Sequence, residues 1–270
     1  MTEQAEKEAT AQDVATLLQA LDIGHDGFAV LHVSLRAIGP FAGGAEGLLR
    51  AFTDYLSQGM LMVPTHTWAT VNRAQPVFDV RSTVPCVGVF PQICARKAFL
   101  QPGAVRTLHP THSAALFGKH ARQYAAGEEN VRSRTAPEGV WGRLYGAGAR
   151  VLLVGVGLER NTYMHSLDEA YNGLPYENPD SFFPSLTIDA AGQEHRCPAM
   201  NCNGYWPSRD FPLLEPYLRQ SGALSYATLG HAAVTCFDVP KGHDAVLDLC
   251  RKAGNAKDLA SLVQAAGVTG

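Results

Sequence analysis

Long hydrophobic runs and a secretion signal are both missing from this chain of 270 residues. No apolar stretch approaches the roughly 20 residues that a membrane-spanning helix needs. The chain starts with MTEQAEKEATAQDVATLLQAL, which is acidic and amphipathic, whereas a signal peptide has a basic start and an apolar centre. We therefore expect a cytoplasmic protein without membrane partners.

Closely spaced cysteines are missing as well. No cysteine belongs to a CxxC motif. Except for the pair Cys197 and Cys202, the cysteines lie far apart in the sequence: Cys86, Cys94, Cys197, Cys202, Cys236 and Cys250. A disulfide framework or a structural zinc site would need denser spacing. Reduced thiols are the expectation.

The chain also lacks a strong excess of one charge, because 22 Lys and Arg face 25 Asp and Glu. No basic patch is visible, so we expect no nucleic-acid partner. Hydrophobic residues make up 46% of the chain, which is enough to bury a sizeable core. No repeat, low-complexity tract or linker divides the sequence, so it predicts a single domain over residues 1–270. A homo-oligomer is left open.

The recognisable elements alternate between strand and helix. GFAVLHVSL predicts a buried strand, AEGLLRAFTDYLSQG a helix, and MLMVPTHTW a second strand ended by Pro64. This βαβ order predicts an α/β fold with a mixed, partly parallel sheet flanked by helices. Further on, RVLLVGVG and AAVTCFDV predict strands, SLTIDAAGQEHR a hairpin, FPLLEPYLRQSGAL a helix despite Pro216, and SAALFGKHARQYAAG another helix. Residues 69–110 look rich in loops.

Polar residues gather where the predicted strands end, in HVSLRAIGPFAGG, in PTHTW and after LLVGVG. Ligands of open α/β sheets tend to bind beyond the carboxyl ends of strands, so these segments are expected to converge. Ser113, at the start of a predicted helix, would suit a phosphate together with Arg106.

The segment NTYMHSLDEA places His165, Asp168 and Glu169 at positions i, i+3 and i+4, which share one face of a helix. The three residues could be a base held by an acid, a pair of metal ligands, or an ordinary helix start. His109 and His112 in HPTH could also ligate a metal, but no HExxH motif or Cys/His quartet accompanies them. We expect no metal. Without GxGxxG or GxSxG, a dinucleotide fold and an α/β-hydrolase are also disfavoured.

Taken together, these segments resemble the aminoglycoside 3-N-acetyltransferase family. The resemblance is carried by LHVSLRAIGPFAGGAEGLLRAF, GMLMVPTHTW, PGAVRTLHPTHSAALFGKHA and GRLYGAGARVLLVGVGLERNTYMHSLDEA, in this order. It extends from about Asp26 to Asp248. It implies an α/β acyltransferase fold distinct from the GNAT fold, with acetyl-CoA (coenzyme A) as cosubstrate and a small-molecule amine as acceptor.

The resemblance also assigns roles to particular residues. It implies coenzyme A binding by Ser34, Leu35, Arg36, Arg106 and Ser113, a catalytic centre at His165 with Asp168 and Glu169, and an acceptor site with His66, Trp68, Thr162 and Tyr171. A neutral histidine suits the removal of a proton from an amine, and a carboxylate would fix its tautomer. The family usually has glutamate where this chain has Asp168, so either carboxylate could support His165.

Three functions follow as hypotheses. The leading one is acetyl-CoA-dependent N-acetylation of an aminoglycoside antibiotic, hence antibiotic resistance. The second keeps coenzyme A and moves the acceptor to a biosynthetic amino sugar, nucleotide or peptide amine. CPAMNCNGYWPSRDF contains few acidic residues where aminoglycoside-modifying members usually carry several, and this favours the second. The third is a non-catalytic coenzyme A-binding module.

Overall fold

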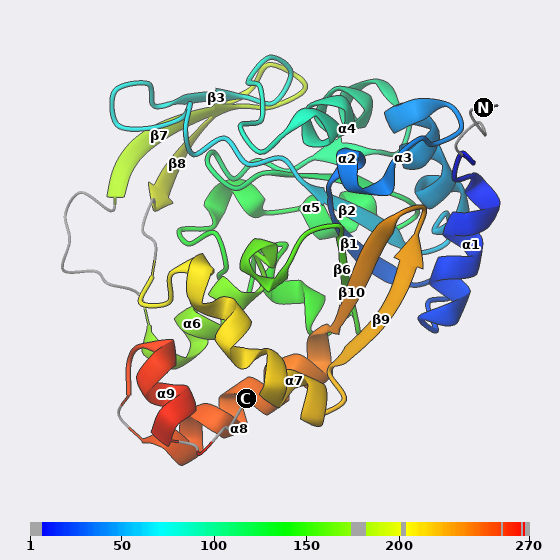
Figure 1. Cartoon of the computed structure of the whole chain (residues 1–270). Coiled ribbons are helices and arrows are strands. Elements are labelled where there is room, and N and C mark those ends of the chain that lie inside the picture. Colours follow the sequence, from blue (N-terminus) through cyan, green and yellow to red (C-terminus); the bar gives the residue numbers. More distant parts are fainter. Residues whose placement is uncertain (1–6, 174–181, 201–203, 255, 266, 268–270) are drawn as a thin grey trace.

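The computed structural model describes residues 7–173, 182–200, 204–254, 256–265 and 267. Within them, a seven-stranded sheet has the order β4-β5-β2-β1-β6-β10-β9, and Figure 1 labels its strands β1, β2, β6, β9 and β10. In that order its strands are β4 (Val105–Arg106), β5 (Ala114–Phe117), β2 (Met60–Pro64), β1 (Phe28–Val33), β6 (Arg150–Val154), β10 (Ala232–Asp238) and β9 (Leu224–Leu229). β1 runs parallel to β2 and β6, and the other pairings are antiparallel. The predicted mixed, partly parallel sheet is confirmed.

Side chains of the central strands alternate between two apolar layers, as successive residues of a strand must. In β1, Val30 belongs to one buried cluster, whereas Ala29 and Leu31 belong to the other. In β6, Val151 and Leu153 lie opposite their neighbours in the same way. Because both faces are covered, the strands are apolar nearly throughout.

Helices supply the outer side of each layer. One cluster packs under α1 (Ala11–Ala20), α2 (Leu35–Ile38), α3 (Gly44–Tyr55) and α4 (Val89–Leu100). The other packs under α5 (Ala121–Ala125), α6 (Met164–Asn172), α7 (Glu215–Gln220), α8 (Val239–Ala253) and α9 (Leu259–Ala265). Short 3₁₀ turns connect these elements: η1 (Glu128–Asn130), η2 (Gly142–Leu144), η3 (Leu158–Arg160) and η5 (Ser208–Leu214). In the described part of the chain, no helix has the length and apolar character to cross a membrane.

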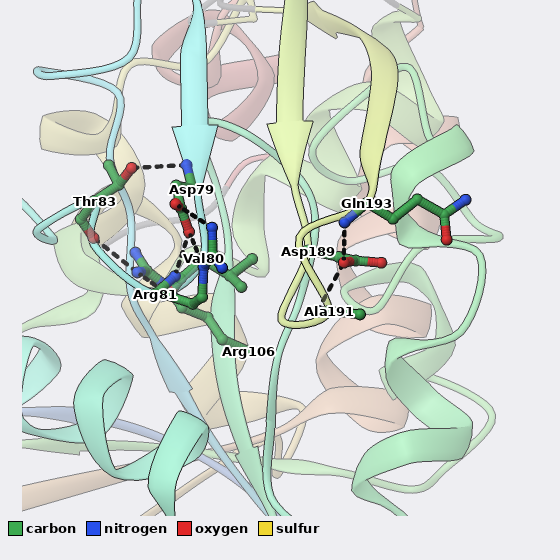
Figure 2. A network of polar contacts seen from close by, with 8 residues as sticks. All are labelled: Asp79, Val80, Arg81, Thr83, Arg106, Asp189, Ala191 and Gln193. Carbon is green, nitrogen blue, oxygen red and sulfur yellow. Dashed lines mark hydrogen bonds and ion pairs between the residues drawn. The ribbon is translucent and has the colours of Figure 1, made fainter.

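A smaller sheet lies beside the large one and has the order β3-β7-β8 (Figure 1). Its strands are β3 (Val77–Asp79), β7 (Phe182–Ile188) and β8 (Glu194–Met200). β7 and β8 form the predicted antiparallel hairpin. The carboxylate of Asp189 accepts hydrogen bonds from the amides of Ala191 and Gln193 and so closes the turn (Figure 2).

One prediction about secondary structure is wrong. The helix expected from Ser113 is the strand β5 followed by the short helix α5. All four side chains of β5 are buried, and a short apolar run of this kind has no periodicity that separates strand from helix. Residues 69–110 are rich in loops, as predicted, and also contain the helix α4 and the short strands β3 and β4. The helix predicted around Pro216 exists as α7, which tolerates proline in its first turn.

Candidate active site

The strand-end segments converge as predicted. Because β1, β2 and β6 are parallel, their carboxyl ends meet at one edge of the sheet. A cavity of about 860 Å³ opens there. Its lining includes Ser34 after β1, His66 after β2, and Thr162 and His165 after β6. Trp68 also lines it and is 46% exposed.

His66 connects the segment after β2 to the segment after β6. Its Nε2 is hydrogen-bonded to the Thr162 hydroxyl at 3.2 Å, and its ring centroid lies 4.7 Å from that of His112. Arg134 reaches the same place, where its Nη1 donates to Nε2 of His112 at 3.4 Å. Nδ1 of His112 therefore carries the ring hydrogen and donates to the Thr111 hydroxyl at 2.8 Å.

The HPTH pair does not have the arrangement of a metal site. Nδ1 of His109 accepts from the backbone amides of Thr111 and His112, at 3.4 and 3.1 Å, so it is engaged within its own turn. Among the described residues, no group of three or more His, Cys, Asp or Glu side chains is placed to hold a metal ion.

The histidines of this site are held in the neutral form. Burial, assisted by the charge of Arg134, lowers the pKa of His66, His112 and His165 well below the usual value of 6.5. Burial also lowers the pKa of His32, which lines the same cavity, to about 3. At neutral pH these rings are therefore unprotonated, and each keeps one ring nitrogen with a free lone pair.

His165 is part of the cavity wall and lies at the start of the helix α6. Its Nε2 is hydrogen-bonded to the Ser208 hydroxyl at 3.2 Å, and its ring meets that of Phe211 edge-on at 5.0 Å. Its Nδ1 is buried and has no hydrogen-bond partner among the described residues. In this structure neither Asp168 nor Glu169 is hydrogen-bonded to the His165 ring, which differs from the expected arrangement of histidine and supporting carboxylate.

Asp168 instead organises a turn that lies 37 and 38 residues further along the chain. Its Oδ2 accepts from the amides of Tyr205 and Trp206 at 2.8 and 2.9 Å, and its Oδ1 accepts from the side chain of Asn172 at 2.8 Å. Gly204 allows this approach, since it has φ +64° and a Cβ there would lie 2.1 Å from Oδ2. Burial raises the pKa of Asp168, although these hydrogen bonds oppose the shift. The geometry gives Asp168 a structural task.

Glu169 is bonded to the segment before η2. Its Oε2 accepts hydrogen bonds from the hydroxyls of Ser133 and Thr135, the two neighbours of Arg134. Both carboxylates predicted to be catalytic thus hold other segments against α6.

The residues expected to bind coenzyme A separate into two groups. Ser34 lines the cavity and caps α2 by accepting from the amide of Ala37, Leu35 is half-buried, and Arg36 is exposed. Arg106 is only 5% exposed and Ser113 is fully buried.

Arg106 and Ser113 direct their polar atoms into the protein. Arg106 donates to the carbonyl oxygens of Val80 and Thr83 at 3.1 and 2.7 Å (Figure 2). It also donates to the carbonyl and hydroxyl of Thr65 and to Ser113, whose own hydroxyl donates to the Thr65 carbonyl. Since Ser113 precedes a strand, the phosphate site predicted at a helix start is wrong.

Sequence reasoning misplaced one acceptor residue and missed others. Tyr171 packs against Trp206, and its hydroxyl donates to the carbonyl of Gly254, outside the cavity lining. His32, Glu159 and Arg160 line the cavity from within the segments predicted to converge, whereas Cys86, Arg134 and Ser208 line it from outside them. Arg134 lies in VRSRTAPEG, where no periodicity or motif distinguishes it from its neighbours.

Comparison with known proteins identifies the class. The profile of the aminoglycoside 3-N-acetyltransferase family matches residues 30–250, so the chain belongs to this family. Aminoglycoside N(3)-acetyltransferase VII of Streptomyces paromomycinus is 29% identical over 193 residues, which cover 63% of this chain and 65% of that protein. Aminoglycoside N(3)-acetyltransferase IX of Micromonospora chalcea is 30% identical over 154 residues, 50% of this chain and 53% of that protein. The aligned part thus spans about half to two thirds of the length of these relatives.

Solved structures share the fold over nearly the whole chain. A mutant of aminoglycoside acetyltransferase AAC(3)-IVa in complex with a gentamicin matches with a TM-score of 0.73 at 21% identity, covering 91% of this chain and 90% of that one. AAC-IIIb in a binary complex with CoASH matches with a TM-score of 0.73 at 16% identity, covering 93% and 99%. The predicted fold, the one shared by these acetyltransferases, is confirmed.

Proposed function

We propose that this protein is an acetyl-CoA-dependent N-acetyltransferase, with an aminoglycoside amine as the first acceptor to test. The observation that carries the proposal is the half-buried His165, whose pKa is lowered so that it stays neutral, at the cavity where the ends of three parallel strands meet. Family membership supports the reaction class, and the names of the relatives support the acceptor.

The cavity suits a thioester cosubstrate. Part of the lining is apolar and would accept the uncharged arm of coenzyme A: Leu31, Val33, Val87, Phe90, Pro91 and Val156. Next to it, buried ring nitrogens of His32 and His66 have no hydrogen-bond partner among the described residues. Ser34, Leu35 and the exposed Arg36 lie directly after β1, Ser34 lines the cavity, and all three remain our candidates for contacts with the cosubstrate. Acetyl-CoA would supply the activated acetyl group.

His165 acts as the general base in this proposal. An alkyl amine is mostly protonated at neutral pH and must lose a proton to become a nucleophile. For Nε2 to accept that proton, Nδ1 carries the ring hydrogen and the Ser208 hydroxyl donates to Nε2 at rest. Thr162, hydrogen-bonded to His66, is placed at the same wall and is a candidate donor to the developing oxyanion.

A second acceptor class is favoured by the charges around the cavity. Among its described lining residues, Glu159 is the one carboxylate and lies 3.9 Å from Arg160, while Arg134 adds a further positive charge. A polycationic aminoglycoside gains most from several carboxylates. An amine with fewer positive charges, such as an amino sugar or a nucleotide amine, is therefore the alternative acceptor.

The test is release of free coenzyme A from acetyl-CoA with gentamicin, kanamycin, tobramycin and monoamine sugars as acceptors. A positioned general base typically raises the reaction rate by about 10²–10⁴-fold. The kcat of His165→Ala should therefore fall by that factor, while the variant remains folded. His25→Ala is the matched control, because His25 is exposed and precedes β1 at the opposite edge of the sheet. The absence of thiol release with every amine, or full activity of His165→Ala, would refute the proposal.

A further inference from the structure

Helix α6 carries both His165 and, one turn later, Glu169. Glu169 accepts hydrogen bonds from Ser133 and Thr135 through the same carboxylate oxygen, Oε2. These two residues flank Arg134, whose guanidinium enters the cavity and reaches His112. One helix thus presents the candidate base and also anchors the segment that brings a positive charge to it.

We propose that Glu169 is a positioning residue that clamps residues 133–135 to α6, so that Arg134 holds His165 and the bound acceptor amine in their uncharged, reactive forms. The inference rests on the proposed acetyltransferase function. It assigns to Glu169 a task other than the direct support of His165 that its spacing suggested.

Residues 133–135 are buried and are held together by hydrogen bonds. Ser133, Arg134 and Thr135 are 3%, 8% and 4% exposed. The Ser133 hydroxyl also accepts from the amide of Thr135 at 3.2 Å, which closes a tight turn around Arg134. Both neighbours of Arg134 are fixed to one carboxylate, so its backbone has little freedom and the guanidinium is directed to one place.

A fixed cation in a buried site disfavours every further positive charge near it, because the surroundings screen it poorly. Arg134, His66 and His112 line the same cavity as His165, and their charged or titratable groups act on it electrostatically. After burial itself, Arg134 is the next cause that lowers the pKa of His165. Glu159 and Arg160 line the same cavity as a close pair of opposite charge. An ammonium group entering the cavity meets the same field and loses its proton more readily.

The positive charge of Arg134 should make the site selective among acceptor amines. An acceptor with one amine needs only that group to be uncharged, whereas a polycation brings several charges toward Arg134. The clamp therefore favours acceptors with a single amine, or with an anionic group beside the amine, at the position next to His165.

The experiment measures kcat/KM against pH by thiol release, together with an NMR titration of the histidine rings in the protein without substrates. In Arg134→Gln, the pKa of His165 and the acid limb of the rate profile should both move upward by about one pH unit. Glu169→Ala should shift them in the same direction, and Glu169→Gln less, because an amide oxygen still accepts from both hydroxyls. Arg134→Lys, which keeps the charge, should leave both close to the wild-type values.

Arg251→Gln is the control for loss of a positive charge, since Arg251 is exposed on α8 and should change neither value. An unchanged His165 titration in Arg134→Gln would overturn the proposal, even if kcat fell, because a purely structural clamp would behave in that way. If Arg134→Gln did not fold, the comparison of Glu169→Ala with Glu169→Gln would decide. If the wild type released no thiol with any amine, the proposed function would fail, and the NMR titration would still test the clamp.

Discussion

Removal of the Asp168 carboxylate should unfold the protein more easily rather than disable its chemistry. In Asp168→Ala, the amides of Tyr205 and Trp206 lose their acceptor inside the protein. A buried group left without its hydrogen bond costs about 1–3 kcal/mol. The two amides together predict a loss of about 2–6 kcal/mol, a large share of the roughly 5–15 kcal/mol that stabilise a typical domain.

The assay is thermal and urea unfolding followed by circular dichroism, combined with the thiol-release rate of the folded protein. Each kcal/mol shifts the Tm of a chain of this size by about 2–4 °C, so a drop on the order of 10 °C is expected. Gly204→Ala should destabilise as well, because its Cβ would collide with Oδ2 of Asp168. Asp54→Ala, at an exposed position of α3, should change stability by less than about 0.5 kcal/mol. A Tm unchanged in Asp168→Ala, with kcat reduced more than about 100-fold, would refute this reasoning and return Asp168 to the catalytic centre.

Three further outcomes are expected. Ser208→Ala should lower kcat about fivefold, the worth of one hydrogen bond of about 1 kcal/mol, and a loss as large as that of His165→Ala would contradict a supporting role. Burial lowers the pKa of three neutral histidines below the value in the unfolded chain: His66, His109 and His112. The unfolded state therefore binds more protons, and the protein loses stability as the pH falls below about 6.5. Each contributes a slope of up to about 1.4 kcal/mol per pH unit, and urea unfolding at pH values of about 7.5 and 5.5 should show a loss of several kcal/mol. Arg106→Met should lower the Tm by several degrees and leave the KM for acetyl-CoA unchanged; a raised KM with normal stability would favour the original cofactor role.

The catalytic candidates illustrate how far spacing along a helix reaches. The sequence places His165, Asp168 and Glu169 on one helical face, and α6 is a helix over these residues. Which side chain each carboxylate meets depends on segments distant along the chain. Asp168 is bonded to the turn at Tyr205, and Glu169 to the loop at Ser133. Local periodicity carries no information about such partners.

The phosphate-binding candidates show a second limit. Arg106 and Ser113 have suitable chemistry, but the apolar run after Ser113 continues as a buried strand, where no helix end presents free amides. The guanidinium is then directed to carbonyl oxygens of neighbouring loops (Figure 2). Burial, which only the assembled fold decides, turned expected ligand contacts into internal ones.

By itself, the sequence determined the apolar strands, the βαβ order and the convergence of polar strand ends, because continuous apolar runs and the order of strand and helix are local patterns. It also singled out His165 and the family. Only the tertiary structure decided that Ser208 adjoins His165, that Asp168 supports a turn, and that Glu169 holds Arg134 in the cavity. These are hydrogen bonds between segments tens of residues apart, and folding brings them together by packing α6 against loops that carry no pattern of their own.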